Sequence, residues 1–261
     1  MVAPSPVPLS AIVKALSETL CLDDFANDVS HNGLQVEGAS DGVRKICCGV
    51  DATPAFYERA RACGAQLLIV HHGISWGTSL SRISGENYHL VAPLIRSGTA
   101  LFAAHLPLDA HPQFGNNAQL CKALGLLNLE PFAQWHGFTI GWKGSLPEPI
   151  RWTEMLERLA VACPDAPLRH VDSGPEFVQR IGIVSGGCGA EEYRQAAAEG
   201  LDAFITGEMN LAAYHAACLH PVHYAAAGHY ATERFGVRAI TEYVADRFGL
   251  PWEMIDFHLP Y

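Results

Sequence analysis

Two adjacent histidines, His71 and His72, follow the most strand-like run of the sequence, residues 66–70. This run is mostly apolar, which is typical of a buried strand in an α/β protein. Binding sites of such proteins form at the carboxyl ends of parallel strands, and imidazole is a common metal ligand there. The histidine pair therefore predicts a metal-binding site.

Two further apolar runs end in the same kind of residue. The run 99–104 leads into His105 and Asp109, and the run 221–227 leads into His229 and Glu233. His229 and Glu233 are four residues apart, so on a helix both side chains face one point in space. A single histidine beside a strand more often packs within the protein, but three such clusters favour a binding site.

The candidate metal ligands are His71, His72, Asp109, His229 and Glu233. One tetrahedral site needs only four ligands, and carboxylates can neutralise a dication or bridge two of them. The set therefore predicts two divalent metal ions per chain. Nitrogen and oxygen ligands together suit Zn, Mn, Fe or Ni, so the residue types leave the identity of the metal open.

Six segments in this order along the chain carry a family resemblance: HNGLQVEG at 31–38, VHHG at 70–73, HLPLDAHP at 105–112, GNNA at 115–118, AFITGE at 203–208 and GHYATER at 228–234. They resemble the blocks of the Nif-three-like dinuclear metal-centre hexameric proteins, often named GTP cyclohydrolase 1 type 2 homologues. The resemblance extends from near residue 10 to the C-terminus. Many members of that family have proline where this chain has Gly73, a difference that affects the shape of the loop and no ligand.

The resemblance implies the same five ligands, with Glu233 as the bridging carboxylate. It places His105 close to the metals, in a supporting or catalytic role, and it implies a homohexamer.

The leading functional hypothesis is a divalent-metal hydrolase, in which His105 or Glu208 transfers a proton to or from the attacking water. A nucleotide or pterin-like heterocycle as the small-molecule substrate is implied by the resemblance alone. The competing hypothesis is a hexamer that binds or delivers metal without turnover. Substitution of His105 separates the two, because only an enzyme would lose a reaction while it keeps its metal.

Composition restricts the class of partner. The net charge of −10 argues against an extended nucleic-acid surface or an anionic membrane as partner, because both require clustered Lys and Arg. Residues 1–8 lack the basic start and the apolar run of a signal peptide, and no stretch is apolar enough to span a membrane. We therefore expect a cytoplasmic protein.

Two small-residue features have alternative interpretations. The eight cysteines show no CxxC spacing, which argues against a zinc finger and a disulfide framework. The adjacent pair Cys47 and Cys48 is predicted to be two small core residues of a strand. The turn Gly186–Gly189 lies between a predicted strand and a predicted helix, where backbone amides can bind a phosphate. Such a turn is more often only a connection, and the sequence leaves both interpretations open.

The hydrophobic pattern predicts an α/β fold of two facing halves built from βαβ units, with the metal site in the cleft between them. We expect strands at 45–51, 66–70, 99–104, 138–143, 180–185, 203–205, 221–227 and 252–257, and helices at 9–20, 54–63, 88–97, 117–124, 152–162, 190–198 and 232–247. Residues 21–38 should be irregular, Gly144 should begin a turn and residues 147–149 should form a linker. Residues 1–125 and 181–261 would form the ligand-bearing halves, and 126–180 a wall, lid or oligomer contact.

Overall fold

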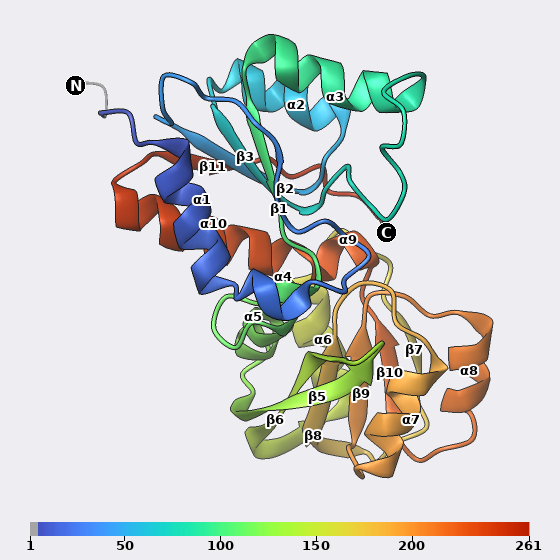
Figure 1. Ribbon diagram of the computed structural model, residues 1–261. Coiled ribbons are helices and arrows are strands. Elements are labelled where there is room, and N and C mark those ends of the chain that lie inside the picture. Colours follow the sequence, from blue (N-terminus) through green and yellow to red (C-terminus); the bar gives the residue numbers. More distant parts are fainter. Residues whose placement is uncertain (1–4, 261) are drawn as a thin grey trace. The chain divides into compact units, whose positions relative to one another are not determined.

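The computed structural model describes residues 5–260, which pack into two compact units (Figure 1). Unit 1 holds residues 5–108 and Gly236–Phe257. Unit 2 holds Asp109–Phe235 and the residues from His258 to Pro260. Each unit contains its own sheet, so the α/β class predicted from the sequence is confirmed.

Unit 1 contains a five-stranded sheet in the order β1-β4-β3-β2-β11. The strands are β1 (Gly33–Val36), β2 (Ile46–Asp51), β3 (Leu67–His72), β4 (Ala100–Ala103) and β11 (Trp252–Met254). β11, β2, β3 and β4 run parallel to one another, and β1 is antiparallel to β4. The carboxyl ends of β2, β3 and β4 therefore lie at one edge of the sheet.

The helical elements of unit 1 are α1 (Leu9–Thr19), the short 3-10 helix η1 (Leu22–Phe25), α2 (Pro54–Ala62) and α3 (Glu86–Ser97). α4 (Leu106–Ala110) and α10 (Arg234–Phe248) carry the chain from one unit to the other. α2 and α3 lie side by side over one face of the sheet, and α1 and α10 cover the other face (Figure 1). α2 begins where the Thr53 hydroxyl accepts a hydrogen bond from Phe56 N at 3.3 Å.

The core of unit 1 explains why the sequences of its strands are continuous apolar runs. Leu68 and Val70 of β3 pack with Phe56 of α2, whereas Leu67 and Ile69, also buried, point to the opposite face. A parallel sheet covered by helices on both faces needs apolar residues at every strand position. Cysteines 47 and 48 of β2 are buried in this way, as predicted.

Unit 2 contains a six-stranded sheet in the order β5-β6-β8-β9-β10-β7. The strands are β5 (Leu127–Trp135), β6 (Phe138–Arg151), β7 (Arg169–Val171), β8 (Phe177–Val184), β9 (Ala203–Thr206) and β10 (His223–Ala226). β8, β9 and β10 are parallel, and β5, β6 and β7 are each antiparallel to their neighbours. The parallel part again gathers three carboxyl ends at one edge.

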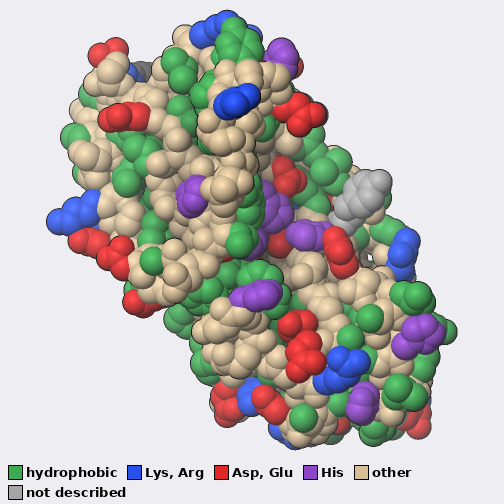
Figure 2. Space-filling view, turned by 45° about the vertical axis from the view of Figure 1, so that its right-hand side comes forward, with side chains coloured by type: hydrophobic (Ala, Val, Ile, Leu, Met, Phe, Trp, Pro, Cys, Tyr) green, Lys and Arg blue, Asp and Glu red, His purple; other side chains and the backbone are tan. Residues whose placement is uncertain are grey.

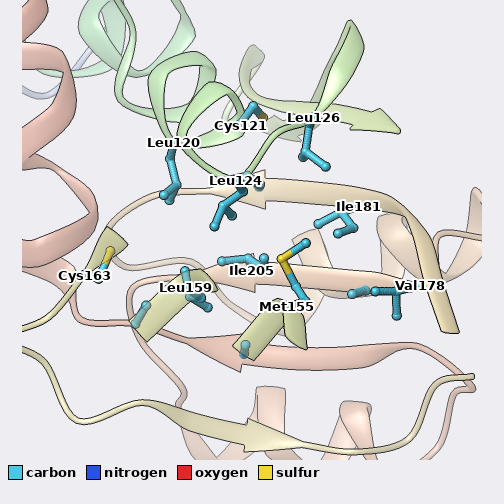
Figure 3. Close-up of a cluster of buried hydrophobic side chains, with 14 of the residues drawn as sticks. Leu120, Cys121, Leu124, Leu126, Met155, Leu159, Cys163, Val178, Ile181 and Ile205 are labelled. Carbon is cyan, nitrogen blue, oxygen red and sulfur yellow. The ribbon is translucent and has the colours of Figure 1, made fainter. Parts of the chain in front are cut away.

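The helices of unit 2 are α5 (Asn116–Ala123), α6 (Trp152–Ala162), α7 (Ala190–Ala198), α8 (Leu211–Ala217) and α9 (His229–Thr232). In Figure 3, Met155 and Leu159 of α6 and Leu124, which follows α5, lie close to Ile181 and Ile205 of the sheet. All five side chains are buried. This apolar layer holds the parallel strands in place and so fixes the edge at which they end.

Both predicted βαβ units are present. β2, α2 and β3 form the first with parallel strands, and β8, α7 and β9 form the second. The bounds predicted for the helices at 152–162 and 190–198 match α6 and α7. β5, β7 and α8 lie outside the predicted elements, because their short or mixed-polarity segments show no clear period.

Three local predictions are wrong. β6 continues through Gly144 and through residues 147–149 to Arg151, where a turn and a linker were expected. Its pairing with β8 shifts register between Ser145 and Ile150, and an irregular ladder accepts prolines because fewer backbone N–H donors are needed there. The segment 21–38 contains η1 and β1 and is not simply irregular.

The compact units divide the chain differently from the predicted halves 1–125 and 181–261. Residues 126–180 contribute β5, β6, β7 and most of β8 to the same sheet as β9 and β10. Hydrogen bonding between strands that are distant in the sequence determines which residues form one unit. The positions of the candidate ligands along the sequence do not indicate this pairing.

Residues 5–260 contain no helix that has both the length and the apolar character needed to cross a membrane. On the face of the molecule shown in Figure 2, Lys and Arg side chains are spread among Asp and Glu and do not gather into one patch.

Candidate metal-binding site

Three histidines meet at the carboxyl edge of the unit 1 sheet. His71 and His72 are the last two residues of β3, and His105 follows β4 after one intervening residue. A ring nitrogen of each lies within 4.8 Å of the others. The neighbouring parallel strands thus bring together the two histidine clusters that the sequence separates by more than thirty residues.

The Nδ1 atom of each of these rings faces an acceptor. His71 Nδ1 lies 2.9 Å from the Ala104 carbonyl, His72 Nδ1 lies 2.8 Å from Asp51 Oδ1, and His105 Nδ1 lies 3.0 Å from Asp28 Oδ1. An acceptor at Nδ1 keeps the proton there, so the lone pair suited to a metal is on Nε2. The Nε2 atoms of His71 and His72 are thus suited to a divalent transition metal, and that of His105 lies close to them.

The loop between η1 and β1 orients His105. Asp28 also accepts hydrogen bonds from Asn32 Nδ2 at 2.9 Å and from Leu106 N at 3.1 Å, and Asn32 Oδ1 accepts one from His105 N at 2.7 Å. Burial alone would raise the pKa of the Asp28 carboxyl, but the hydrogen bonds and the charge of His105 lower it below its ordinary value. Asp28 is therefore a carboxylate that accepts a hydrogen bond from the His105 ring.

The residue that departs from the family pattern, Gly73, is explained by its neighbours. A Cβ atom at this position would lie 2.2 Å from Gln35 Oε1. That oxygen accepts hydrogen bonds from Ile74 N at 2.7 Å and Ser75 N at 3.1 Å, which shape the loop after the histidine pair. The Gly73 carbonyl in turn accepts a hydrogen bond from Trp76 Nε1 at 2.7 Å. The glycine thus lets the Gln35 amide reach this loop.

The second donor set lies in unit 2. His229 begins α9, and Glu233 stands directly after its last residue. His229 Nε2 lies 3.1 Å from Glu233 Oε1, so the helical spacing predicted from the sequence is present. Glu233 is buried, which means that its charge needs a nearby cation or proton.

Glu208, the residue after Gly207 at the end of β9, contacts the other nitrogen of the same ring. Its Oε1 lies 2.7 Å from His229 Nδ1. Burial lowers the pKa of His229, but the hydrogen bonds and charges of Glu233 and Glu208 outweigh burial and raise it to about 9. A metal at Nε2 must displace a proton, so coordination there is favoured by alkaline pH.

Three turns with a glycine after a strand lie next to His229 and Glu233. Gly186, Gly207 and Gly228 follow β8, β9 and β10, and Gly207 N donates to Gly186 O at 3.0 Å while Gly228 N donates to Gly207 O at 2.9 Å. Gly186 N also donates to Thr232 Oγ1 of α9 at 2.9 Å. A Cβ atom at Gly186 would lie 2.0 Å from Glu233 Oε1, so the turn is filled by this carboxylate. Of the two interpretations of the turn, this contact favours a support for the ligands over a phosphate loop.

Asp109 is held by a separate group of buried polar side chains. Its Oδ1 accepts hydrogen bonds from Asn116 Nδ2 at 2.9 Å and from Ser185 Oγ at 3.1 Å. Asn117 Oδ1 accepts one from Ser185 N at 2.5 Å and so fixes the serine. A carboxylate oxygen of Asp109 lies within 4.8 Å of one of Glu233. Two carboxylates at this separation match a site that must neutralise dications.

Sequence reasoning missed the residues that orient the ligands: Asp28, Asp51, Asn116 and Ser185. Asp51 had a signal, because it ends β2 as His72 ends β3 and the two are paired in register. Asn116 lies in the segment 115–118, for which only the family resemblance indicates a role. Asp28 lies in a loop and has no pattern of its own, so only the fold brings it to His105.

We expect Glu208→Gln to weaken metal binding about 10- to 100-fold, the usual effect of losing a carboxylate that orients a ligating histidine. The apparent dissociation constant would be measured by competition with a chromophoric chelator at constant pH. Glu191→Gln is the matched control, because Glu191 pairs with Arg194 at the surface of α7. Equal affinities in the Glu208 variant and the control would show that the His229 contact does not position the ring for a metal.

A pocket of about 250 Å³ opens beside Glu208 and His229 within unit 2. It is bounded by the ends of β9 and β10, by the start of β7 and by Pro260. The His229 ring, which lines this pocket, is therefore accessible to a small molecule.

Comparison with known proteins gives one consistent result. Residues 7–259 match the family model described as Duf34/NIF3 (NGG1p interacting factor 3). The "GTP cyclohydrolase 1 type 2 homolog" of Deinococcus radiodurans is 40% identical over 246 residues, which cover 94% of this chain and 92% of the relative.

Two solved structures are similar over nearly the whole chain. One, titled "protein ybgI, unknown function", has a TM-score of 0.89 and 35% identity and covers 98% of this chain and 100% of its own. The other, TTHA1606 from Thermus thermophilus, has a TM-score of 0.84 and 34% identity and covers 96% and 98%. The resemblance seen in the six sequence segments is thus confirmed, and the chain belongs to the Duf34/NIF3 family.

Proposed function

We propose that His71, His72, Asp109, His229 and Glu233 bind two divalent metal ions and that the protein uses them in a hydrolytic reaction. The observation that carries this proposal is the shared orientation of the histidines. His71, His72 and His229 each have Nδ1 at an acceptor, which presents Nε2 as the ligand atom. Metals bound in such a set would supply an activated water at neutral pH and a Lewis acid for the scissile group.

We propose further that the donor sets of the two units serve one dinuclear centre. His105 and Asp109 stand on either side of the boundary at Leu108, only four residues apart. A chain of four residues spans at most about 14 Å, so connectivity alone keeps His105 and Asp109 within that distance of each other. Glu233, the bridging carboxylate in this proposal, likewise stands three residues before the chain returns to unit 1 at Gly236.

His105 is the residue we propose for proton transfer. Its Nδ1 contacts the Asp28 carboxylate, and this pairing stabilises the imidazolium that forms when Nε2 accepts a proton from water. Glu208 was the other candidate from the sequence. Its hydrogen bond with His229 supports a role in positioning that ring. Its side chain is half exposed, which is also compatible with proton exchange with solvent.

The proposed substrate is a small nucleotide or pterin-like heterocycle. The names of the relatives, homologues of a GTP cyclohydrolase, support this choice. The net charge of −10 and the scattered Lys and Arg side chains on the visible face favour a small molecule over a nucleic-acid polymer. A homohexamer in the cytoplasm is part of the same proposal and rests on the family resemblance.

His105→Gln tests whether the centre is catalytic. Protein reconstituted with Mn, Fe, Zn or Ni would be screened for hydrolysis of GTP and related nucleotides, and the variant would be compared under the best condition. We expect a loss of about 10²- to 10⁴-fold in kcat with unchanged metal content, because a general acid–base is removed and the proposed ligands are kept.

The control is His89→Gln, which changes an exposed histidine of α3. Metal-loaded wild-type protein that hydrolyses none of these compounds would argue against the hydrolase and favour the metal-binding or metal-delivery hypothesis.

A further inference from the structure

The pocket beside Glu208 and His229 contains one cationic side chain, Arg169. Arg169 is the first residue of β7 and pairs with Ala226 at the end of β10. Since His229 follows Ala226 by three residues, the register of β7 on β10 places the arginine at the same edge of the sheet as this ligand. The whole pocket belongs to unit 2.

Glu208 and Arg169, the acidic and the basic side chain of the pocket, differ in their contacts with the protein. The Glu208 carboxylate is held by the His229 ring at 2.7 Å. Arg169, in contrast, takes part in none of the ion pairs formed within residues 5–260. A guanidinium group presents several N–H donors in a planar fork that matches the two oxygens of a carboxylate or phosphate. Its position in a pocket, where it forms no ion pair with any of residues 5–260, points to an anionic ligand.

The remaining walls limit the size and character of that ligand. Pro167, Met209 and Pro260 provide apolar surface next to the arginine. A volume of about 250 Å³ is slightly below the roughly 300–1,000 Å³ of drug-sized ligand pockets, so it suits a single ring with one charged substituent.

We propose that Arg169 binds the anionic group, a phosphate or a carboxylate, of the small molecule that the neighbouring metal centre processes. This inference rests on the proposed function for the identity of the site, but the pocket itself needs no metal. The arginine would fix the ligand by its charged end and leave the opposite end directed to His229. It would thereby select anionic substrates over neutral ones of the same shape.

Calorimetric titration with phenyl phosphate, benzoate and benzyl alcohol tests the proposal. These probes share one ring and differ in the charged group, so their comparison separates phosphate from carboxylate recognition. We expect at least one of the two anions to bind wild-type protein more tightly than the alcohol. Arg169→Gln should weaken that binding about 10- to 100-fold, the effect of removing a charged hydrogen-bond donor. Arg169→Lys should restore part of it, since Lys keeps the charge without the fork.

Arg194→Gln is the matched control, because Arg194 is a surface arginine of unit 2 outside the pocket. Each titration would be run on metal-loaded and on chelator-treated protein, with the metal content measured separately. Absence of bound metal would overturn the proposed function, whereas the Arg169 inference would still be decided by the chelator-treated samples. Equal anion binding by wild type and Arg169→Gln, or no anion binding by wild type in either state, would overturn the inference.

Discussion

Glu233→Gln should abolish most of the metal binding of this protein. Wild-type protein purified without a metal-affinity tag is expected to hold about two equivalents of divalent metal per chain, and the variant well under one. Glutamine keeps the shape of the side chain but removes the negative charge that lies 3.1 Å from His229 Nε2 and close to Asp109. Elemental analysis of both proteins provides the measurement.

The same substitution should leave the metal-free protein folded. Glutamine has the same size as Glu233, and the His229 ring that pairs with Glu233 keeps a second carboxylate partner in Glu208, so no charge is left without a partner. Thermal unfolding with and without added metal separates the effects, because a metal that binds only the native state raises Tm. We expect this rise in wild type and not in the variant.

Glu192→Gln is the control for burial. Glu192 is 5% exposed against 3% for Glu233, and its carboxylate caps α7 by accepting a hydrogen bond from Gly189 N at 2.8 Å. This variant should lose some stability but keep its metal. If Glu233→Gln kept two equivalents, the bridging role and the dinuclear proposal would both fail.

Gly186→Ala is the second substitution with a large expected effect, although it replaces no ligand. Gly186 has φ +67°, and the added Cβ would lie 2.0 Å from Glu233 Oε1. The carboxylate must move aside by about 1.5 Å or more to reach an ordinary contact distance of roughly 3.5 Å. A flexible end of a side chain can make this shift, so the fold should survive while the ligand leaves its position. We expect a loss of metal similar to that of Glu233→Gln.

Gly200→Ala provides a control with the same backbone strain. Gly200 also has φ +67° and lies in unit 2, but its nearest neighbour, Arg180 Nη1, is at an ordinary contact distance of 3.8 Å. Each alanine should cost about 1–2 kcal/mol of folding free energy, as measured by denaturant unfolding, because a Cβ is unfavourable in this conformation. Metal loss in both variants to the same degree would attribute the effect to strain and not to the Glu233 contact.

Much of the candidate site could be predicted from the sequence, because its residues stand at strand ends. His71, His72 and His229 each follow an apolar run, and such runs mark strands buried on both faces. The two βαβ units were predictable for the same reason, since strand and helix periods alternate clearly in them. In parallel sheets the end of a strand is also the edge where sites form, so the local pattern carried information about function.

The contacts that orient these residues could not be predicted, because they depend on pairing between distant segments. Asp28 reaches His105 across 77 positions of the sequence, and Ser185 reaches Asp109 across 76. The predicted strand, 138–143, is shorter than β6, because the prolines of β6 are typical of a linker. Only the partner strand β8, which tolerates an irregular ladder at that point, allows the segment to remain a strand.

The pairing of β11 with β2 has a consequence for synthesis of the chain. All six strands of the unit 2 sheet lie within residues 127–226, so this sheet is available for folding as soon as that stretch has been translated. The unit 1 sheet begins nearer the N-terminus, yet it receives its edge strand only with Trp252–Met254. Until then β2 exposes a row of unpaired backbone groups, which is a template for pairing with other chains. The N-terminal unit is therefore the last to be completed, and loss of the final ten residues would leave it open.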